Sequence, residues 1–204
     1  MAAGILHLYT DFVCPFCFIA ERSTVPRLLA EFDLELDWCG FELHPGTPVG
    51  GRPLSDLFPG VDLSALHAQT KRFAASFGVS DFQPPNRLQN SRRALALAEV
   101  ARAHHCLEPF REAAFDAHWR GGEDLEETAT LKRLAAVVGL NPDRALREAD
   151  EPKILERVDA RQQQARRGGV TGIPTFVIGS IRVVGCQPYA ALASAAQRAN
   201  VPRR

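Results

Sequence analysis

The sequence has no excess charge of either sign, because 24 lysines and arginines balance 24 aspartates and glutamates. Without a net positive field, the composition gives no indication of binding to nucleic acid or to an anionic membrane. No apolar stretch reaches the roughly 20 residues that a membrane-spanning helix needs. Repeats of fixed period and low-complexity tracts are absent as well. The composition is therefore that of an ordinary globular protein, and its 46% hydrophobic residues suffice for a core.

Cysteine is scarce, since the chain has five, an odd number at irregular spacing. Such a set does not look like the disulfide framework of a small secreted protein. In a reducing compartment, a close pair of cysteines is more often catalytic or metal-binding than structural. Residues 1–4 contain no basic region, long apolar core or cleavage site of an export signal. We therefore expect a cytoplasmic protein.

Two cysteines, Cys14 and Cys17, stand between a short apolar run at 5–9 and a segment of helical composition. The run is typical of a buried strand, and Pro15 favours the first position of a helix. This placement makes Cys14 the N-cap. We expect its sulfur to accept hydrogen bonds from backbone N–H groups and to lie at the positive end of the helix dipole. Both effects favour the thiolate, which is the attacking form.

Cys17 lies one turn further along the predicted helix, close enough to form a disulfide with Cys14 and to resolve a mixed disulfide. The alternatives are two small buried residues or half of a metal site. The junction of strand and helix favours a redox pair. A structural zinc site needs four ligands in paired short spacings, and only one such pair exists, so we expect no metal. Disulfide exchange needs no organic cofactor.

The order of the predicted elements indicates an α/β frame. A helix is predicted at 15–32, with a bend at Pro26, and a half-exposed strand at 34–41. Together with the first strand they predict a parallel βαβ unit with a right-handed connection. The segment 43–59 is dense in proline and glycine and is predicted to be a loop.

The sequence after this loop changes to helical periodicity, and no strand is predicted between 62 and 150. Helices are predicted at 61–77, 86–105, 108–119, 124–140, 142–149 and 152–167. Two strands around a Gly179-Ser180 turn then form a hairpin, and a final helix follows at 187–199. We expect a discontinuous α/β domain formed by 1–52 and 151–204, interrupted by an inserted helical domain at 53–150.

This order, together with Cys14-Pro15-Phe16-Cys17 and Gly-Ile-Pro-Thr-Phe at 172–176, resembles the thioredoxin-fold oxidoreductases of the DsbA superfamily over essentially the whole chain. The segments most similar to the FrnE-type branch, whose members lack export signals, are 11–17, 41–43, 90–94 and 169–176. The resemblance implies a thioredoxin fold with a large all-helical insertion. It also implies that the chain is an enzyme, a thiol–disulfide oxidoreductase.

The resemblance implies that Cys14 is the nucleophilic cysteine and that Cys17 is the cysteine that resolves the mixed disulfide. It also implies that the Ile173–Pro174 peptide bond is cis. In this family the backbone before the proline is offered to an extended substrate segment, so Ile173 and Pro174 are expected to contact substrate. Phe16, in the exposed turn between the cysteines, is a further expected contact. The periplasmic oxidant DsbA has Pro-His between its cysteines. Phenylalanine brings no charge, so the direction of electron flow stays open.

Two residues predicted to lie near the cysteine pair, Cys186 and Asp11, each have two possible roles. Cys186 follows Gly185 at the end of the last strand, on the face that carries the active site in thioredoxin-like folds. It is either a small buried residue or an auxiliary thiol that takes part in exchange or is glutathionylated. Asp11, three residues before Cys14, either assists proton transfer or holds the local turn.

The expected partners are protein or small-molecule thiols and disulfides, with glutathione as a candidate co-substrate. Two other functions stay open. The first is a glutathione-linked enzyme on the same fold, of the kappa-class glutathione transferase or 2-hydroxychromene-2-carboxylate isomerase type, in which serine typically stands at the position of Cys14. The second is a non-enzymatic binding or chaperone module.

Overall fold

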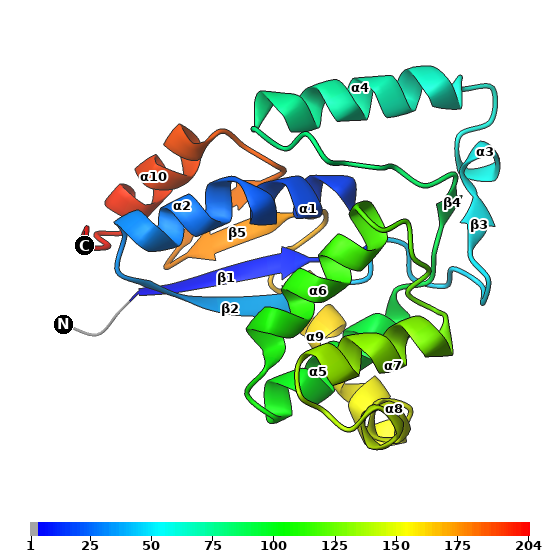
Figure 1. Cartoon of the computed structure of the whole chain (residues 1–204). Helices are drawn as coiled ribbons and strands as arrows, with labels where there is room; N and C mark the ends of the chain where they lie inside the picture. Colours follow the sequence, from blue (N-terminus) through cyan, green and yellow to red (C-terminus); the bar gives the residue numbers. More distant parts are fainter. Residues whose placement is uncertain (1–3) are drawn as a thin grey trace.

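The computed structural model describes residues 4–204. Their centre is a four-stranded mixed sheet of order β2-β1-β5-β6 (Figure 1). The strands are β1 (Gly4–Thr10), β2 (Leu34–Gly40), β5 (Thr175–Ile178) and β6 (Ile181–Val184). β1 pairs parallel with β2 and antiparallel with β5, and β5 and β6 form the predicted hairpin. The sheet thus joins the first and last parts of the chain, and it confirms the predicted βαβ unit.

The core of this sheet follows from strand register. Leu8 of β1 lies between Trp38 of β2 and Phe176 of β5, and all three side chains are buried. The helices beside the sheet are α1 (Pro15–Arg22), α2 (Thr24–Glu31) and α10 (Tyr189–Arg198). α2 packs against β2 and α10 against β6. We call the four strands with these helices the frame.

The predicted single helix at 15–32 is two helices, so the prediction of a bend at Pro26 was wrong. The chain breaks at Ser23, whose backbone leaves helical angles and whose hydroxyl donates to Ile19 O at 2.6 Å. Pro26 instead lies in the first turn of α2. There its missing N–H costs nothing, because the first four N–H groups of a helix have no intrahelical partner.

Residues 41–167, from the end of β2 to the last helix before β5, form what we call the insert, which is mainly helical (Figure 1). Its helices are α3 (Leu54–Leu57), α4 (Leu63–Ser76), α5 (Arg92–Ala103), α6 (Leu107–Trp119), α7 (Thr128–Val137), α8 (Pro142–Ala149) and α9 (Pro152–Arg167). Helices α5 to α9 pack on one another, and α9 also contacts β2. Within residues 4–204, no helix combines the length and the apolar character that crossing a membrane requires.

The insert also contains two short strands, β3 (Arg52–Pro53) and β4 (Arg87–Leu88), which pair antiparallel. The predicted absence of strands between 62 and 150 was therefore wrong, as was the prediction that 43–59 is only loop, since β3 and α3 lie in it. Strands of two residues show no alternation that a periodicity analysis could detect.

Turns closed by short polar side chains precede two helices that begin later than their apolar patterns predict. The helix predicted at 86–105 begins only at Arg92, because the side chain of Asn90 accepts the Arg92 N–H at 2.8 Å. The helix predicted at 124–140 begins only at Thr128, because Asp124 accepts the Glu126 N–H at 2.8 Å in a turn before it. Such short polar side chains compete with the helix for backbone N–H groups.

A buried polar network ties the insert to the frame. Glu21 of α1 accepts hydrogen bonds from the Thr10 hydroxyl at 3.0 Å and from the Trp38 indole at 2.9 Å. Arg111 of α6 donates to the other oxygen of the same carboxylate. Glu21 and Arg111 are both buried, so each charge depends on the other for compensation.

Candidate active site

The cysteine pair lies where β1 meets α1, as predicted. Cys14 is the N-cap of α1 and Cys17 lies in its first turn, with exposures of 2% and 0%. Both are free thiols. The predicted hydrogen bonds from helix N–H groups to the Cys14 sulfur are not formed, and this expectation was wrong. Cys14 Sγ is directed instead to the carbonyl oxygen of Ile173, at 3.9 Å.

The loop opposite Cys14 is formed by the residues that the sequence indicated. The Ile173–Pro174 peptide bond is cis, as expected. Thr175 Oγ1 donates to Gly172 O at 2.7 Å, which closes the turn around this bond. The fold therefore brings Cys14 against Ile173 across 159 positions of sequence.

Cys17 lies beneath Cys14, closed off from solvent. Burial raises the pKa of the Cys17 thiol well above its ordinary value, and the hydrogen bond with Cys14 raises it further. The Thr10 hydroxyl and the Asp11 backbone N–H act in the opposite direction. The pair is thus unequal: Cys14 borders open space, whereas Cys17 is a protonated thiol that can reach only its neighbour.

A third thiol, Cys186, lies near the pair. Burial raises the pKa of Cys186 to about 12, with a further contribution from Cys14. The preceding residue fixes its place, because Gly185 N donates to Pro174 O at 2.7 Å. Cys186 is partly buried, and its high pKa makes it a weak nucleophile at neutral pH.

Asp11 is fully buried, and its contacts hold the loops around the pair. Its backbone carbonyl accepts the Cys14 N–H at 3.1 Å, and its Oδ2 accepts the Leu43 N–H at 2.7 Å. Burial raises the pKa of the Asp11 carboxyl to about 6, although the Leu43 N–H lowers it. Oδ1 has no hydrogen-bond partner within the described residues. The hydrogen bonds thus favour the structural interpretation of Asp11.

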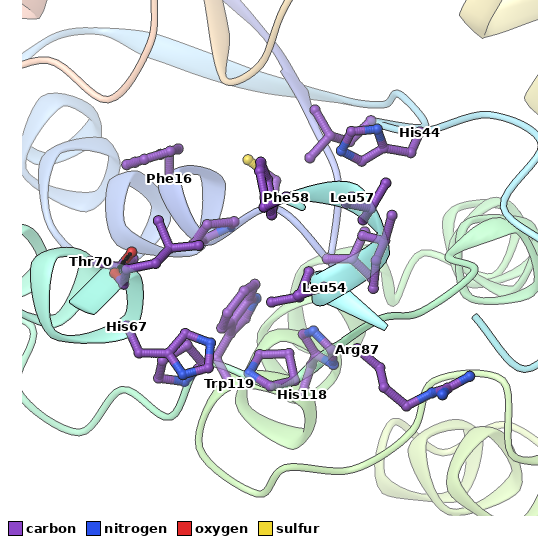
Figure 2. A pocket seen from close by; sticks show the side chains of 18 of the residues that line it. Phe16, His44, Leu54, Leu57, Phe58, His67, Thr70, Arg87, His118 and Trp119 are labelled. Atoms are coloured by element: carbon purple, nitrogen blue, oxygen red, sulfur yellow. Dashed lines mark hydrogen bonds between the residues drawn. The ribbon is translucent and has the colours of Figure 1, made fainter. Parts of the chain in front are cut away.

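A cavity of about 270 Å³ opens beside Cys14 (Figure 2). Cys14, Phe16 and Ile173 contribute to its wall from the frame and the cis-proline loop. The insert supplies most of the remaining wall, through residues of α3, α4, β4 and the end of α6: Leu54, Leu57, Phe58, Leu66, His67, Thr70, Pro84, Pro85, Arg87, Leu88, His118 and Trp119. The first group was predicted from the sequence, and the second was not.

Phe16 of the frame lines the cavity and also contacts the insert. It is 41% exposed, as predicted for the residue between the cysteines, and it lines the cavity. Its ring meets Phe73 of α4 edge-on, with centroids 5.4 Å apart. α4 is thereby held over the active-site end of the frame.

Burial keeps two of the cavity's histidines, His44 and His118, largely uncharged. Burial lowers the pKa of His118 to about 4, although the Glu123 carbonyl that faces its Nδ1 at 3.4 Å raises it. Burial also lowers the pKa of His44, and the charge of Arg52 adds to this effect. Arg87 carries a permanent charge, but its guanidinium donates to the carbonyl oxygens of Gly50 and Gly51. The wall is therefore mainly apolar.

One group of metal-ligating side chains occurs within residues 4–204, away from the cysteine pair. Donor atoms of His7, Asp37 and Cys39 lie within 4.8 Å of one another on β1 and β2. His7 Nδ1 already pairs with Asp37 Oδ2 at 2.8 Å, and Arg102 lies 3.7 Å from the other carboxylate oxygen. Burial, followed by the charge of Asp37, raises the pKa of Cys39 to about 12. A nearby arginine and a protonated thiol both oppose cation binding.

The family follows from a comparison with known domains. Residues 5–197 match the DSBA-like thioredoxin domain. The chain belongs to this family. The match covers nearly the whole chain, so both the frame and the insert are part of the family's domain, and the predicted thioredoxin fold with a helical insertion is confirmed.

Solved structures agree with this assignment at the level of the fold. A probable DsbA oxidoreductase of Streptomyces coelicolor superposes with a TM-score of 0.84 at 22% identity, covering 96% of this chain and 89% of that one. A 2-hydroxychromene-2-carboxylate isomerase superposes with a TM-score of 0.75 at 18% identity, with 95% of each chain covered. The cytosolic disulfide reductase DsbM of Pseudomonas aeruginosa, with GSH, gives 0.67 at 19% identity, covering 95% and 99%. A search of curated proteins finds no match.

Proposed function

We propose that this protein is a thiol–disulfide oxidoreductase that exchanges disulfides through a mixed disulfide on Cys14. The observation that carries the proposal is the meeting of three features: the pair Cys14 and Cys17 at a helix start, the cis-proline loop against Cys14, and a cavity that opens on Cys14. Membership of the DSBA-like family supports it.

In the reductive direction, the Cys14 thiolate attacks one sulfur of a substrate disulfide. A bond forms between Cys14 and that sulfur, and the other substrate sulfur leaves as a thiolate, which takes a proton from water. Cys17 then loses its proton and attacks Cys14 Sγ, which releases the second substrate thiolate and leaves a Cys14–Cys17 disulfide. The substrate gains two electrons, and the oxidative direction is the reverse of these steps.

The positioning of substrate is assigned to Phe16, Ile173 and Pro174. The carbonyl of Ile173 faces Cys14, so a backbone or amide N–H of the substrate can bind there while its sulfur meets Cys14. Phe16 is exposed at the cavity wall and supplies apolar contact. Cys186 is proposed as an auxiliary thiol of the exchange, because Gly185 N donates to Pro174 O at 2.7 Å and so places the neighbouring Cys186 beside the cis-proline loop.

Protein or small-molecule thiols and disulfides are the proposed partners, and glutathione is a candidate co-substrate. The DsbM structure that contains GSH supports a thiol partner on this fold. Within the family we place the chain in the FrnE-like branch and in the cytoplasm, on the strength of the sequence motifs and cysteine content. Cell fractionation with an antibody to the native protein tests the compartment.

A glutathione-linked isomerase is the second candidate, favoured by the superposition on 2-hydroxychromene-2-carboxylate isomerase and by the small cavity. The complete pair Cys14 and Cys17 argues against it, because such chemistry has no use for a resolving thiol. Isomerisation that survives in Cys17→Ser and needs glutathione without consuming it would support this second candidate.

The test of the proposed function is disulfide exchange by wild type, Cys14→Ser and Cys17→Ser, with Cys106→Ser as the matched control. A glutathione redox series and a disulfide-bearing protein serve as substrates. We expect Cys14→Ser to fall to the background rate and Cys106→Ser to match wild type. The redox series also yields a reduction potential, which decides between reductant and oxidant. Full activity in Cys14→Ser would refute the proposal.

A further inference from the structure

The wall that the insert places over Cys14 has a chemical character of its own. We infer that this cavity selects small, neutral disulfides or thiols that carry an aromatic or aliphatic group, in preference to glutathione and to disulfides of folded proteins. The inference rests on the proposed function and narrows its substrate class.

Size is the first argument. An apolar cavity of about 150 Å³ accommodates benzene, so the space of about 270 Å³ beside Cys14 holds one aromatic ring with a short linker to sulfur. Cavities for drug-sized ligands begin at roughly 300 Å³. A tripeptide thiol with extended ends is therefore a poor match for the enclosed part of the site.

Access is the second argument. Cys14 is only 2% exposed, and it reaches open space through the cavity that α3, α4 and β4 border. Ile173, whose carbonyl faces the sulfur, is also buried. A disulfide on the surface of a folded protein cannot bring its sulfur to Cys14 past these segments, whereas a small molecule can enter the space beneath them.

Charge is the third argument. Glutathione carries two carboxylates, and burying either one without a cationic partner is costly. Among the described side chains of the wall, Arg87 is the one with a permanent charge, and backbone carbonyls already hold it. His118 is neutral, with a pKa of about 4. The wall thus offers a carboxylate one guanidinium, already engaged with backbone carbonyls, but offers a ring much apolar surface.

His118 adds a polar contact that suits a neutral ligand. Its Nδ1 faces the Glu123 carbonyl at 3.4 Å, so the proton of the neutral ring belongs on Nδ1 and Nε2 is left as an acceptor. His118 lines the cavity (Figure 2). A hydroxyl or N–H group on an aromatic substrate is the complementary donor.

The test uses single turnover of the reduced full-length protein with three disulfides: bis(4-hydroxybenzyl) disulfide, bis(2-hydroxyethyl) disulfide and glutathione disulfide. Each rate is divided by the rate of the same disulfide with dithiothreitol, which removes differences in intrinsic reactivity. We expect the benzyl compound to exceed the other two by about tenfold or more, the ratio that burial of one aromatic ring supplies.

Variants of α4 assign the preference to the cavity. Thr70 lines the wall and Gln69 beside it is exposed and outside the wall, so Thr70→Lys is tested against Gln69→Lys as its matched control. Thr70→Lys brings a cation to the wall and should lower the benzyl preference severalfold while raising the rate with glutathione disulfide. Leu66→Ala removes apolar wall and should lower the benzyl rate alone.

Two outcomes overturn different claims. Equal normalised rates, or a preference for glutathione disulfide or for a disulfide-bearing folded protein, would overturn the substrate inference while exchange itself persists. Absence of exchange with every disulfide, in wild type as in Cys14→Ser, would overturn the proposed function.

Discussion

The frame and the insert contribute different things to the same cavity. The frame and its cis-proline loop place Cys14, Phe16 and Ile173 at the ends of strands and at a helix start, where strand pairing fixes their positions. Among the described residues, the insert contributes apolar side chains and imidazoles to the wall, but no cysteine. In the proposed mechanism, the frame therefore carries the reacting sulfur, whereas the insert controls access and the choice of substrate.

The largest expected effect on stability comes from breaking the buried ion pair of Glu21 and Arg111, which connects the frame and the insert. Arg111→Met leaves the Glu21 carboxylate buried without its cation, which costs about 3–5 kcal/mol of unfolding free energy. The matched control is Arg133→Met, which removes an exposed pair with Glu123 and should cost about 1 kcal/mol or less. Urea unfolding measures both. Equal losses of unfolding free energy in the two variants would show that the ion pair of Glu21 and Arg111 is not buried in solution.

A second, smaller effect is the pH dependence of stability, to which Asp11 of the frame and His118 of the insert contribute in opposite directions. In folded protein the pKa of Asp11 is raised to about 6 from 3.8, so its contribution to stability is complete below pH 3.8 and is lost as pH rises through 6. The pKa of His118 is lowered to about 4 from 6.5, so its contribution is complete above pH 6.5 and is lost as pH falls through 4. Each amounts to about 3 kcal/mol, and the two oppose each other.

Single variants expose these opposed contributions. Between pH 4 and pH 6, Asp11→Asn should gain more stability with rising pH than wild type does, because only the His118 contribution remains. His118→Gln should lose stability over the same range. Urea unfolding at the two pH values measures the difference. Parallel pH profiles for wild type and both variants would contradict the burial of these two groups.

The smallest expected effect is local to α4, which covers the cavity. Asp62 caps this helix by accepting the N–H groups of Ser64 at 2.9 Å and Ala65 at 3.3 Å. Asp62→Ala should cost about 1 kcal/mol. Faster amide hydrogen exchange in α4, with unchanged exchange in β1 and β5, is the expected result. Exchange that rises equally in the sheet would mean that α4 and the frame unfold together.

The sequence alone predicted the strands of the frame and the start of its first helix, because these signals are local, but it missed the break at Ser23. An apolar run, a proline after Cys14 and a Gly-Ser turn predicted the first strand, the start of α1 and the last hairpin. The cis bond at Ile173–Pro174 came from the family resemblance rather than from local propensity, since trans is the usual state. The pairing of Cys14 with Ile173 likewise depends on the fold, not on spacing.

The cavity wall could not be predicted in the same way. Leu57 and Phe58 stand in a stretch rich in proline and glycine, which was interpreted as loop, and their apolar character was the signal that the stretch packs against something. His118 occupies an ordinary helix position, and its role depends on tertiary contacts. The contact of Glu21 with Arg111 spans 90 positions and leaves no pattern in sequence. The domain boundaries at 52–53 and 150–151 stay predictions.

The central claim is that Cys14 alone forms the covalent link to substrate. The most direct measurement is mass spectrometry of Cys17→Ser after reaction with bis(4-hydroxybenzyl) disulfide, with peptide mapping of the adduct. We expect one benzylthio group per protein, on Cys14 and released by dithiothreitol. An adduct confined to Cys186 or Cys39, or none at all while exchange continues, would contradict it.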